Sequence, residues 1–220
     1  PERIEHEESS LGRSFEVWLY PRGGDRLTAL YDDVTDRTRA EAVRRESQAR
    51  QAFLLALSDA LRAESDADAI ATRALGMLAE RLQADRCYVG VYRVGEDRGE
   101  HGPQVGNDRV APVPSVVRLS DFPEAVRIAS DATLVVDDVA ATQGLTDVDR
   151  RNLDAVGIRA FVVATLRRSQ REPFWSIIVV SADPRRWTAG EVALVEETAE
   201  RTWAAVERAR AQAALRASEE

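Results

Sequence analysis

Two long, highly charged helical segments flank the central part of this sequence and constrain its fold more than any other feature. The first is predicted from Asp36 to about Leu61, and the second from about Glu191 to Glu220. The chain begins at Pro1 without an initiator methionine, and its last helix has no stop signal, so we expect it to be part of a longer protein. A compact domain between helices that lead elsewhere is the layout of a relay module. We therefore expect catalysis to lie outside these residues.

Composition excludes several classes of protein. The 220 residues are 44% hydrophobic and 31% charged, which is enough apolar material for a core. The net charge of −8 argues against a nucleic-acid surface, because phosphate binding needs clustered cations. No apolar run approaches the roughly 18 residues of a membrane span and no signal peptide is present, so we expect a cytoplasmic location without membrane contact. The single cysteine, Cys87, excludes an internal disulfide and fits a reducing compartment.

The first 36 residues indicate a β-hairpin that leads into a helix. Apolar and polar residues alternate over 15–20 and again over 27–34, with a Pro-Arg-Gly-Gly turn between them. Two strands alone are marginally stable in water, so we expect residues 1–36 to be the last part of a domain. In the helix that follows, only the second half has well-packed heptad positions, and residues 37–52 are predicted to be a linker helix.

The remaining residues predict an α+β domain. Its strands are expected in short runs with a period of two, at residues 86–94, 116–119, 133–136, 159–166 and 174–181. Its helices are expected to follow residues that can cap a first turn, namely Ser65, Asp121, Thr146 and Thr188. Residues 95–114, rich in glycine and proline, are predicted to be a mobile loop. This order favours an antiparallel sheet with long helices on one face and short segments on the other.

Two sets of residues are candidate functional surfaces. The first is a ligand pocket on one face of the predicted sheet, lined by Tyr88, Tyr92, Phe122, Val136, Phe161 and Val163. The same residues would also suit a filled core, and both interpretations stay open. The second is a dimer seam on the C-terminal helix, with small residues spaced by three and four, comprising Val192, Val195, Ala199, Thr202, Val206, Ala209 and Ala213.

Several motifs of this region resemble those of a GAF domain. They are ADR at 84–86, TLVVDDV at 133–139, LDAVGIRA at 153–160, PRRWT at 184–188 and AERTWAAVE at 199–207. The resemblance covers residues 53–209, and residues 210–220 look like the start of an exit linker helix. Residues 1–36 are similar to the C-terminal end of a PAS domain, because DVT at 33–35 followed by RTRAE at 37–41 is its usual ending.

The resemblance implies a sensory module of a bacterial two-component, multi-sensor histidine kinase, whose ATP-dependent phosphotransfer lies in a kinase domain outside this chain. It implies a homodimer through the flanking helices, which would pass a signal to the kinase or to further sensor domains. Within this chain it implies no enzyme activity. A cyclic-dinucleotide enzyme, a phosphatase or a transcription factor as the output, and a small-molecule-binding GAF domain, remain alternatives.

The motifs of known GAF chemistries are absent from this sequence, and the cofactor stays unknown. Cyclic-nucleotide-binding GAF domains carry a signature with lysine, and this chain contains no lysine, so a cyclic nucleotide is disfavoured. Bilin-binding members usually show a Cys-His pair where this chain reads GLTD at 144–147, so a covalent bilin is also disfavoured. Methionine-sulfoxide reduction needs two cysteines, and Cys87 has no partner, so a redox role is not expected. His6 and His101 are the only histidines, and His101 lies in the predicted loop without nearby cysteine or paired carboxylates, so no metal site is expected.

Overall fold

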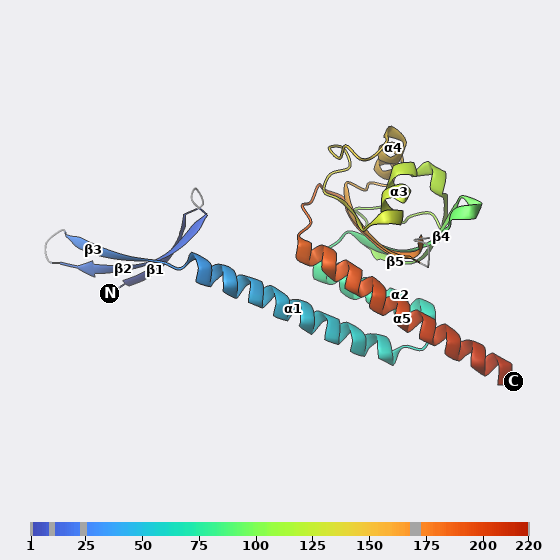
Figure 1. Cartoon of the computed structure of the whole chain (residues 1–220), viewed down its shortest axis with the longest axis horizontal. Helices are drawn as coiled ribbons and strands as arrows, with labels where there is room; N and C mark the ends of the chain where they lie inside the picture. Colours follow the sequence, from blue (N-terminus) through green and yellow to red (C-terminus); the bar gives the residue numbers. More distant parts are fainter. Residues whose placement is uncertain (1, 9–11, 23–25, 168–172, 220) are drawn as a thin grey trace. The chain divides into compact units, whose positions relative to one another are not determined.

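The computed structural model describes residues 2–8, 12–22, 26–167 and 173–219 (Figure 1). The chain divides into two compact units, residues 1–52 and residues 53–220. One helix, α1 (Thr35–Ala63), begins in the first unit and ends in the second.

The first unit contains a three-stranded antiparallel sheet in the order β1-β2-β3. Its strands are β1 (Glu2–Glu8), β2 (Arg13–Pro21) and β3 (Leu27–Asp33). The predicted hairpin is formed by β2 and β3, in which Val17 pairs with Tyr31. Part of its predicted turn, at residues 23–24, lies outside the described residues. The strand β1 was not predicted, because its sequence is almost entirely charged and lacks apolar alternation.

Helix α1 begins where a short polar motif ends β3. The Oδ1 atom of Asp33 accepts hydrogen bonds from the Thr35 backbone N–H at 3.1 Å and from the Thr35 hydroxyl at 2.5 Å. The Ser14 backbone N–H on β2 donates to the Thr35 hydroxyl oxygen at 2.9 Å. The first turn is therefore fixed both to the end of β3 and to the neighbouring strand, as expected for an N-terminal cap.

The second unit is an α+β domain around a six-stranded antiparallel sheet in the order β6-β5-β4-β9-β8-β7, which confirms the predicted fold class. Its strands are β4 (Arg86–Arg93), β5 (Arg98–Gly106), β6 (Val116–Arg118), β7 (Leu134–Val136), β8 (Ala160–Arg167) and β9 (Pro173–Ser181). Its helices are α2 (Ala67–Leu82), α3 (Pro123–Asp131), α4 (Asp147–Ala155) and α5 (Ala189–Glu219), with single 3-10 turns η1 (Val94–Glu96) and η2 (Leu119–Asp121).

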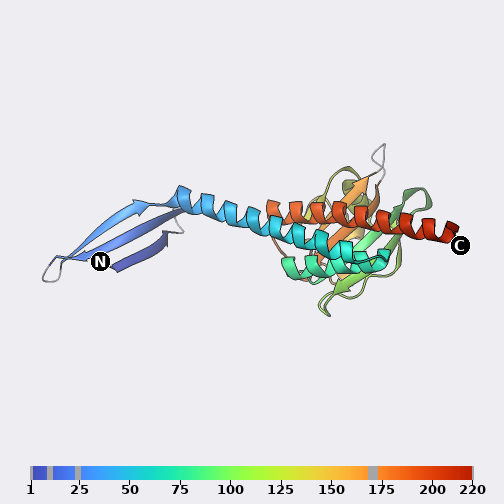
Figure 2. The same cartoon turned by 90° about the horizontal axis from the view of Figure 1, so that it is seen from below.

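Both faces of this sheet are covered, and each face has its own core. Helices α2 and α5 lie on one face, and α3 and α4 lie on the other (Figure 1). Neighbouring residues of one strand face opposite cores, so that Ile177 packs with the long helices and Ile178 packs beneath the short ones. The end of α1 also belongs to the helical core and runs beside α2 and α5 (Figure 2).

The largest departure from the predicted elements is β5, which occupies much of the segment predicted to be a loop. Its glycines and proline conceal the strand, but the backbone pairs with β4 along its length and with β6 over residues 98–100. Because β6 pairs with this first part alone, Pro103 lies where it needs no outward hydrogen bond, which is where a sheet tolerates proline.

Two of the four predicted helix caps are confirmed, and two are wrong. Thr146 and Thr188 each accept a hydrogen bond from the backbone N–H three residues later. Asp66 rather than Ser65 caps α2. Its Oδ1 atom accepts hydrogen bonds from the backbone N–H groups of Asp68 at 3.0 Å and Ala69 at 2.8 Å. At α3 the cap position is Phe122 rather than Asp121, and Pro123 starts the helix without a side-chain cap, which is tolerated since proline has no N–H to satisfy.

Two leucines of α1 test the packing of this helix against the domain. Leu57 is fully buried in the helical core, whereas Leu55 is 68% exposed. We expect Leu57→Ala to lower the free energy of unfolding by about 2–5 kcal/mol, because it leaves a cavity in a packed core. The matched change Leu55→Ala should have an effect within about 0.5 kcal/mol. Urea unfolding of the two variants measures both values, and equal effects would contradict the described packing.

Candidate functional site

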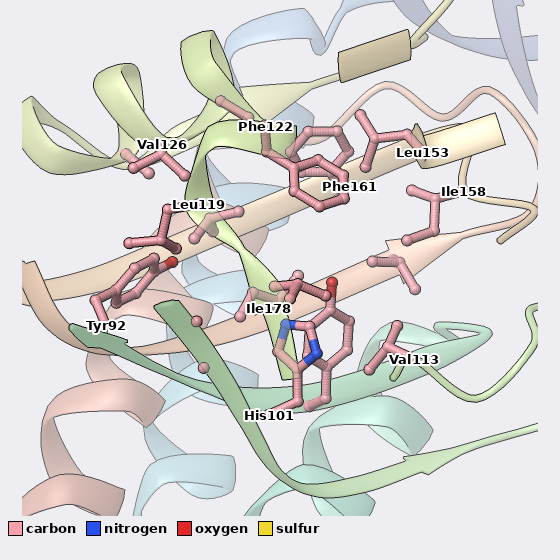
Figure 3. A pocket seen from close by; sticks show the side chains of 18 of the residues that line it. Tyr92, His101, Val113, Leu119, Phe122, Val126, Leu153, Ile158, Phe161 and Ile178 are labelled. Carbon is pink, nitrogen blue, oxygen red and sulfur yellow. The ribbon is translucent and has the colours of Figure 1, made fainter. Parts of the chain in front are cut away.

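A cavity of about 120 Å³ lies between the sheet and the short helices. Alternate residues of the strands form its floor, and α3, α4 and the segments beside them form its roof. In Figure 3, His101 and Phe122 approach the space from opposite sides. The lining side chains are mostly apolar, and they include Val113, Leu119, Phe122, Ala125, Val126, Ala129, Leu134, Leu153, Val156, Ile158, Phe161, Val163, Ile178 and Val180.

Five of the six residues proposed for a pocket line this cavity: Tyr88, Tyr92, Phe122, Phe161 and Val163. The sixth, Val136, does not. Its side chain is 1% exposed and packs in the same core. Its carbonyl oxygen accepts a hydrogen bond from the indole N–H of Trp187 at 3.2 Å. Val136 is therefore a residue of the core and of the link to α5 rather than of the cavity wall.

Gly90 lies between the two tyrosines on β4 and leaves room above the sheet. A Cβ atom at this position would lie 2.8 Å from the Ser176 hydroxyl oxygen and 3.0 Å from the Ile178 Cδ1 atom. Both distances are too short for ordinary contact, so the strand tolerates only glycine here without rearrangement. A glycine inside a strand commonly marks such a close approach.

The polar side-chain groups on the lining are few. The Tyr92 hydroxyl is 3.1 Å from the Ser176 hydroxyl, and the Nδ1 atom of His101 is 2.5 Å from the Pro114 carbonyl oxygen. The rings of Tyr88 and His101 meet edge to face, with centroids 5.0 Å apart. Burial raises the pKa of both tyrosines and lowers the pKa of His101, so all three side chains are neutral near pH 7.

Arg86 at the start of β4 holds the segment that closes one side of the cavity. Its guanidinium donates to the carbonyl oxygens of Asn107 at 3.0 Å and Val110 at 2.9 Å, and to the side-chain oxygen of Gln104 at 3.3 Å. The same oxygen of Gln104 accepts from the backbone N–H of Val113 at 3.0 Å. These bonds position Val113 and Pro114 at the cavity.

His101 and, apart from Phe122, the roof residues were missed by reasoning from the sequence. His101 was placed in a loop, so its alternation with Gly99 on the cavity face was not recognised. The small residues of α3, Ala125 and Ala129, carry no chemical signature. Only a correct strand assignment for β5 would have predicted the histidine beside the tyrosines.

Most of the proposed dimer seam is occupied within the chain itself. Val195, Ala199, Thr202, Val206 and Ala209 are at most 4% exposed, and the four apolar ones belong to the core shared with α2 and the sheet. Val192 is partly buried against the same core, and Ala213 is exposed. The seam therefore packs within one subunit, and a homodimer, which stays a prediction, would need other faces of the flanking helices.

Other candidate chemistries lie apart from the cavity. Cys87 is fully buried on the opposite sheet face, and burial raises its thiol pKa to about 12, which leaves it protonated and unreactive. Within the described residues no cluster of three or more His, Cys, Asp or Glu could hold a metal ion. The described helices include none with the length and apolar character needed to cross a bilayer.

Comparison with known proteins identifies the family. The GAF domain family matches residues 66–206, and the chain belongs to it. GAF domains are sensory and regulatory modules, and this chain contains one. A search of curated proteins finds no match.

Solved structures share the fold at low sequence identity. The phycoerythrobilin-bound GAF domain of a cyanobacterial phytochrome is 14% identical with a TM-score of 0.63, over 74% of this chain and 97% of that one. A protein in its far-red absorbing dark state, with bound biliverdin, is 18% identical with a TM-score of 0.61, over 72% of this chain and 99% of that one. A free methionine-R-sulfoxide reductase from Neisseria meningitidis, in complex with its substrate, is 15% identical with a TM-score of 0.59, over 74% and 91%.

These likenesses correct one expectation about cofactors. The sequence motifs disfavour a covalent bilin, yet several of the similar structures hold bilins. The expectation that a covalent bilin is disfavoured is therefore contradicted by these structures, which share the fold. The expectation against a cyclic nucleotide is not tested by these structures and stays a prediction.

The lowered pKa of His101 predicts a pH-dependent part of the stability. Below the ordinary value of 6.5 the unfolded chain binds a proton that the folded chain resists, so this contribution is present above 6.5 and is lost as the pH falls. We expect the free energy of unfolding to decrease more between about pH 7.5 and about pH 5.5 for the unaltered chain than for His101→Gln. Urea unfolding at both pH values measures this difference, and parallel decreases would contradict it.

Proposed function

We propose that this chain is the sensory module of a bacterial two-component histidine kinase, and that it relays the state of the cavity to its flanking helices. The proposal assigns no catalysis to these residues and assigns ATP-dependent phosphotransfer to a kinase domain elsewhere in the protein. It also takes the module to be cytoplasmic and dimeric, with residues 1–36 as the end of a preceding PAS domain.

The observation that carries the proposal is a direct connection from the cavity to α5. Leu134 of β7 lines the cavity. Two residues later, the Val136 carbonyl oxygen accepts from the Trp187 indole, and the Asp137 side chain accepts from the Trp187 backbone N–H at 3.0 Å. Trp187 immediately precedes the capping residue of α5. A displacement of β7 by a ligand would therefore move the start of that helix.

A second set of contacts ties α5 to the helices that enter the domain. Arg185, next to the same tryptophan, donates to the Leu82 carbonyl oxygen at the end of α2 and pairs with Glu191 in the first turn of α5. Further along, Arg201 of α5 donates to the Ser58 hydroxyl of α1 at 3.0 Å. The connected helices α1, α2 and α5 would respond together, which suits transmission to neighbouring domains.

The kinase assignment is tested on the full-length protein. We expect the reading frame to continue into a phosphoacceptor-histidine helix and an ATP-binding domain, and the purified full-length protein to phosphorylate itself with ATP. A continuation into a cyclic-dinucleotide enzyme, a phosphatase or a DNA-binding domain would contradict the kinase assignment.

Filling the cavity tests the relay. Ala129 of α3 is 3% exposed and lines the cavity, whereas Ala132 at the end of the same helix is exposed. We expect Ala129→Leu in the full-length protein to change the rate of autophosphorylation by about 5-fold or more, which is the scale of typical allosteric coupling. The matched change Ala132→Leu should leave the rate unaltered. Equal rates for both variants, with circular dichroism showing both folded, would contradict the relay.

A further inference from the structure

Two unpartnered polar groups face the otherwise apolar cavity. Tyr88 is 7% exposed and lines the cavity, and within the described residues its hydroxyl has no hydrogen-bond partner. The second group is the Nε2 atom of His101, for which the described residues likewise supply no partner. The hydrogen-bonding capacity of both groups is therefore available to a molecule that occupies the cavity.

The hydrogen bond of His101 determines what its free nitrogen can do. A carbonyl oxygen can only accept, so the Nδ1 atom next to the Pro114 carbonyl must carry the hydrogen. In the neutral ring the Nε2 atom is then an acceptor. The Tyr88 hydroxyl can donate. The rings of the two residues meet edge to face, with centroids 5.0 Å apart, so both side chains lie at the same part of the cavity wall.

A hydroxyl group on a ligand can satisfy both partners, because it donates one hydrogen bond and accepts others. An ionised carboxylate cannot donate to Nε2, and it would be buried without a counter-charge. Glu100 is the acidic residue on the lining, and it pairs with Arg93 at 3.2 Å and with Arg98 at 3.1 Å. Among the residues that the structure describes, the lining includes no arginine that could balance the charge of an anionic ligand. The site therefore favours a neutral molecule.

The volume and the lining favour a single aromatic ring. A cavity of about 120 Å³ is close to the size of an apolar protein cavity of about 150 Å³ that binds benzene. Tyr88, Tyr92, Phe122, Phe161 and His101 surround it with ring faces and edges. Such rings pack best against another ring in edge-to-face or offset geometry.

We propose that this cavity binds a neutral one-ring aromatic alcohol, a phenol, whose hydroxyl donates to His101 Nε2 and accepts from the Tyr88 hydroxyl. The inference rests on the proposed function in taking the cavity as the sensing site. It specifies the chemical class of ligand, which the relay to a kinase leaves open.

Binding to the 220-residue chain tests the class of ligand directly. Isothermal titration calorimetry would compare phenol with toluene, which has a similar shape but no hydroxyl, and with benzoate, which is ionised. We expect phenol to bind about 10-fold or more tightly than toluene, since toluene cannot pair with the Tyr88 hydroxyl or with His101 Nε2, and benzoate to bind more weakly than toluene. Toluene binding as tightly as phenol, or benzoate binding best, would overturn the proposal.

A single-atom change assigns the preference to the cavity. We expect Tyr88→Phe to reduce the ratio of phenol to toluene affinity by about 10-fold, because it removes one partner of the ligand hydroxyl. Tyr31→Phe makes the same change at a tyrosine that is 66% exposed in the first unit, and it should keep the ratio of the unaltered chain. A Tyr88→Phe variant with an unchanged ratio would overturn the assignment.

Nitrogen-15 NMR of the histidine side chains gives a second readout. The chain has two histidines, so His6→Gln leaves the His101 signals alone. We expect phenol, but not toluene, to shift the Nε2 resonance of His101 to lower frequency as it accepts a hydrogen bond, with Nδ1 remaining protonated. Absence of binding by both compounds would overturn this inference, whereas the kinase assignment is judged separately by autophosphorylation.

Discussion

The second unit depends on one constraint: its central strands are apolar on both faces. On β9, Ile177 and Val179 are fully buried against the long helices, while Ile178 and Val180 are at most 6% exposed under the short ones. A sheet of this kind cannot leave either face to water, so the chain must supply a cover for each. The long helices cover one face, and the irregular stretch between β5 and β8 covers the other.

The two covers differ in how completely they fill their faces. The helical cover brings small residues such as Ala71, Ala74 and Ala199 into a close-packed core. The irregular cover consists of short helices and loops above Gly90, with Ala125 and Ala129 where larger side chains would have filled the space. The difference explains why the cavity lies on this face, and why the polar groups of Tyr88 and His101 are found there.

The repeat on α5 illustrates the limit of periodicity as a guide to assembly. Apolar residues spaced by three and four predict that one face of a helix is buried, and five of the seven seam residues, Thr202 among them, are buried. The spacing alone contains no information on whether the covering surface belongs to the same chain. Here α2 and the sheet provide the cover, because their side chains share one core with α5 in the same chain.

The sequence by itself determined the α+β class, most strands, and the capped starts of α4 and α5, because these follow from local alternation and capping chemistry. It proposed five residues that line the cavity, but left open whether they form a pocket or fill a core. Tertiary structure alone decided that Gly99 and His101 belong to a strand, because β5 is held by pairing with β4 and β6 rather than by its own residues. It also decided that Val136 faces the core and that the α5 seam is internal. Each of these depends on which distant segment pairs with a strand or covers a face, and that is a property of the folded chain.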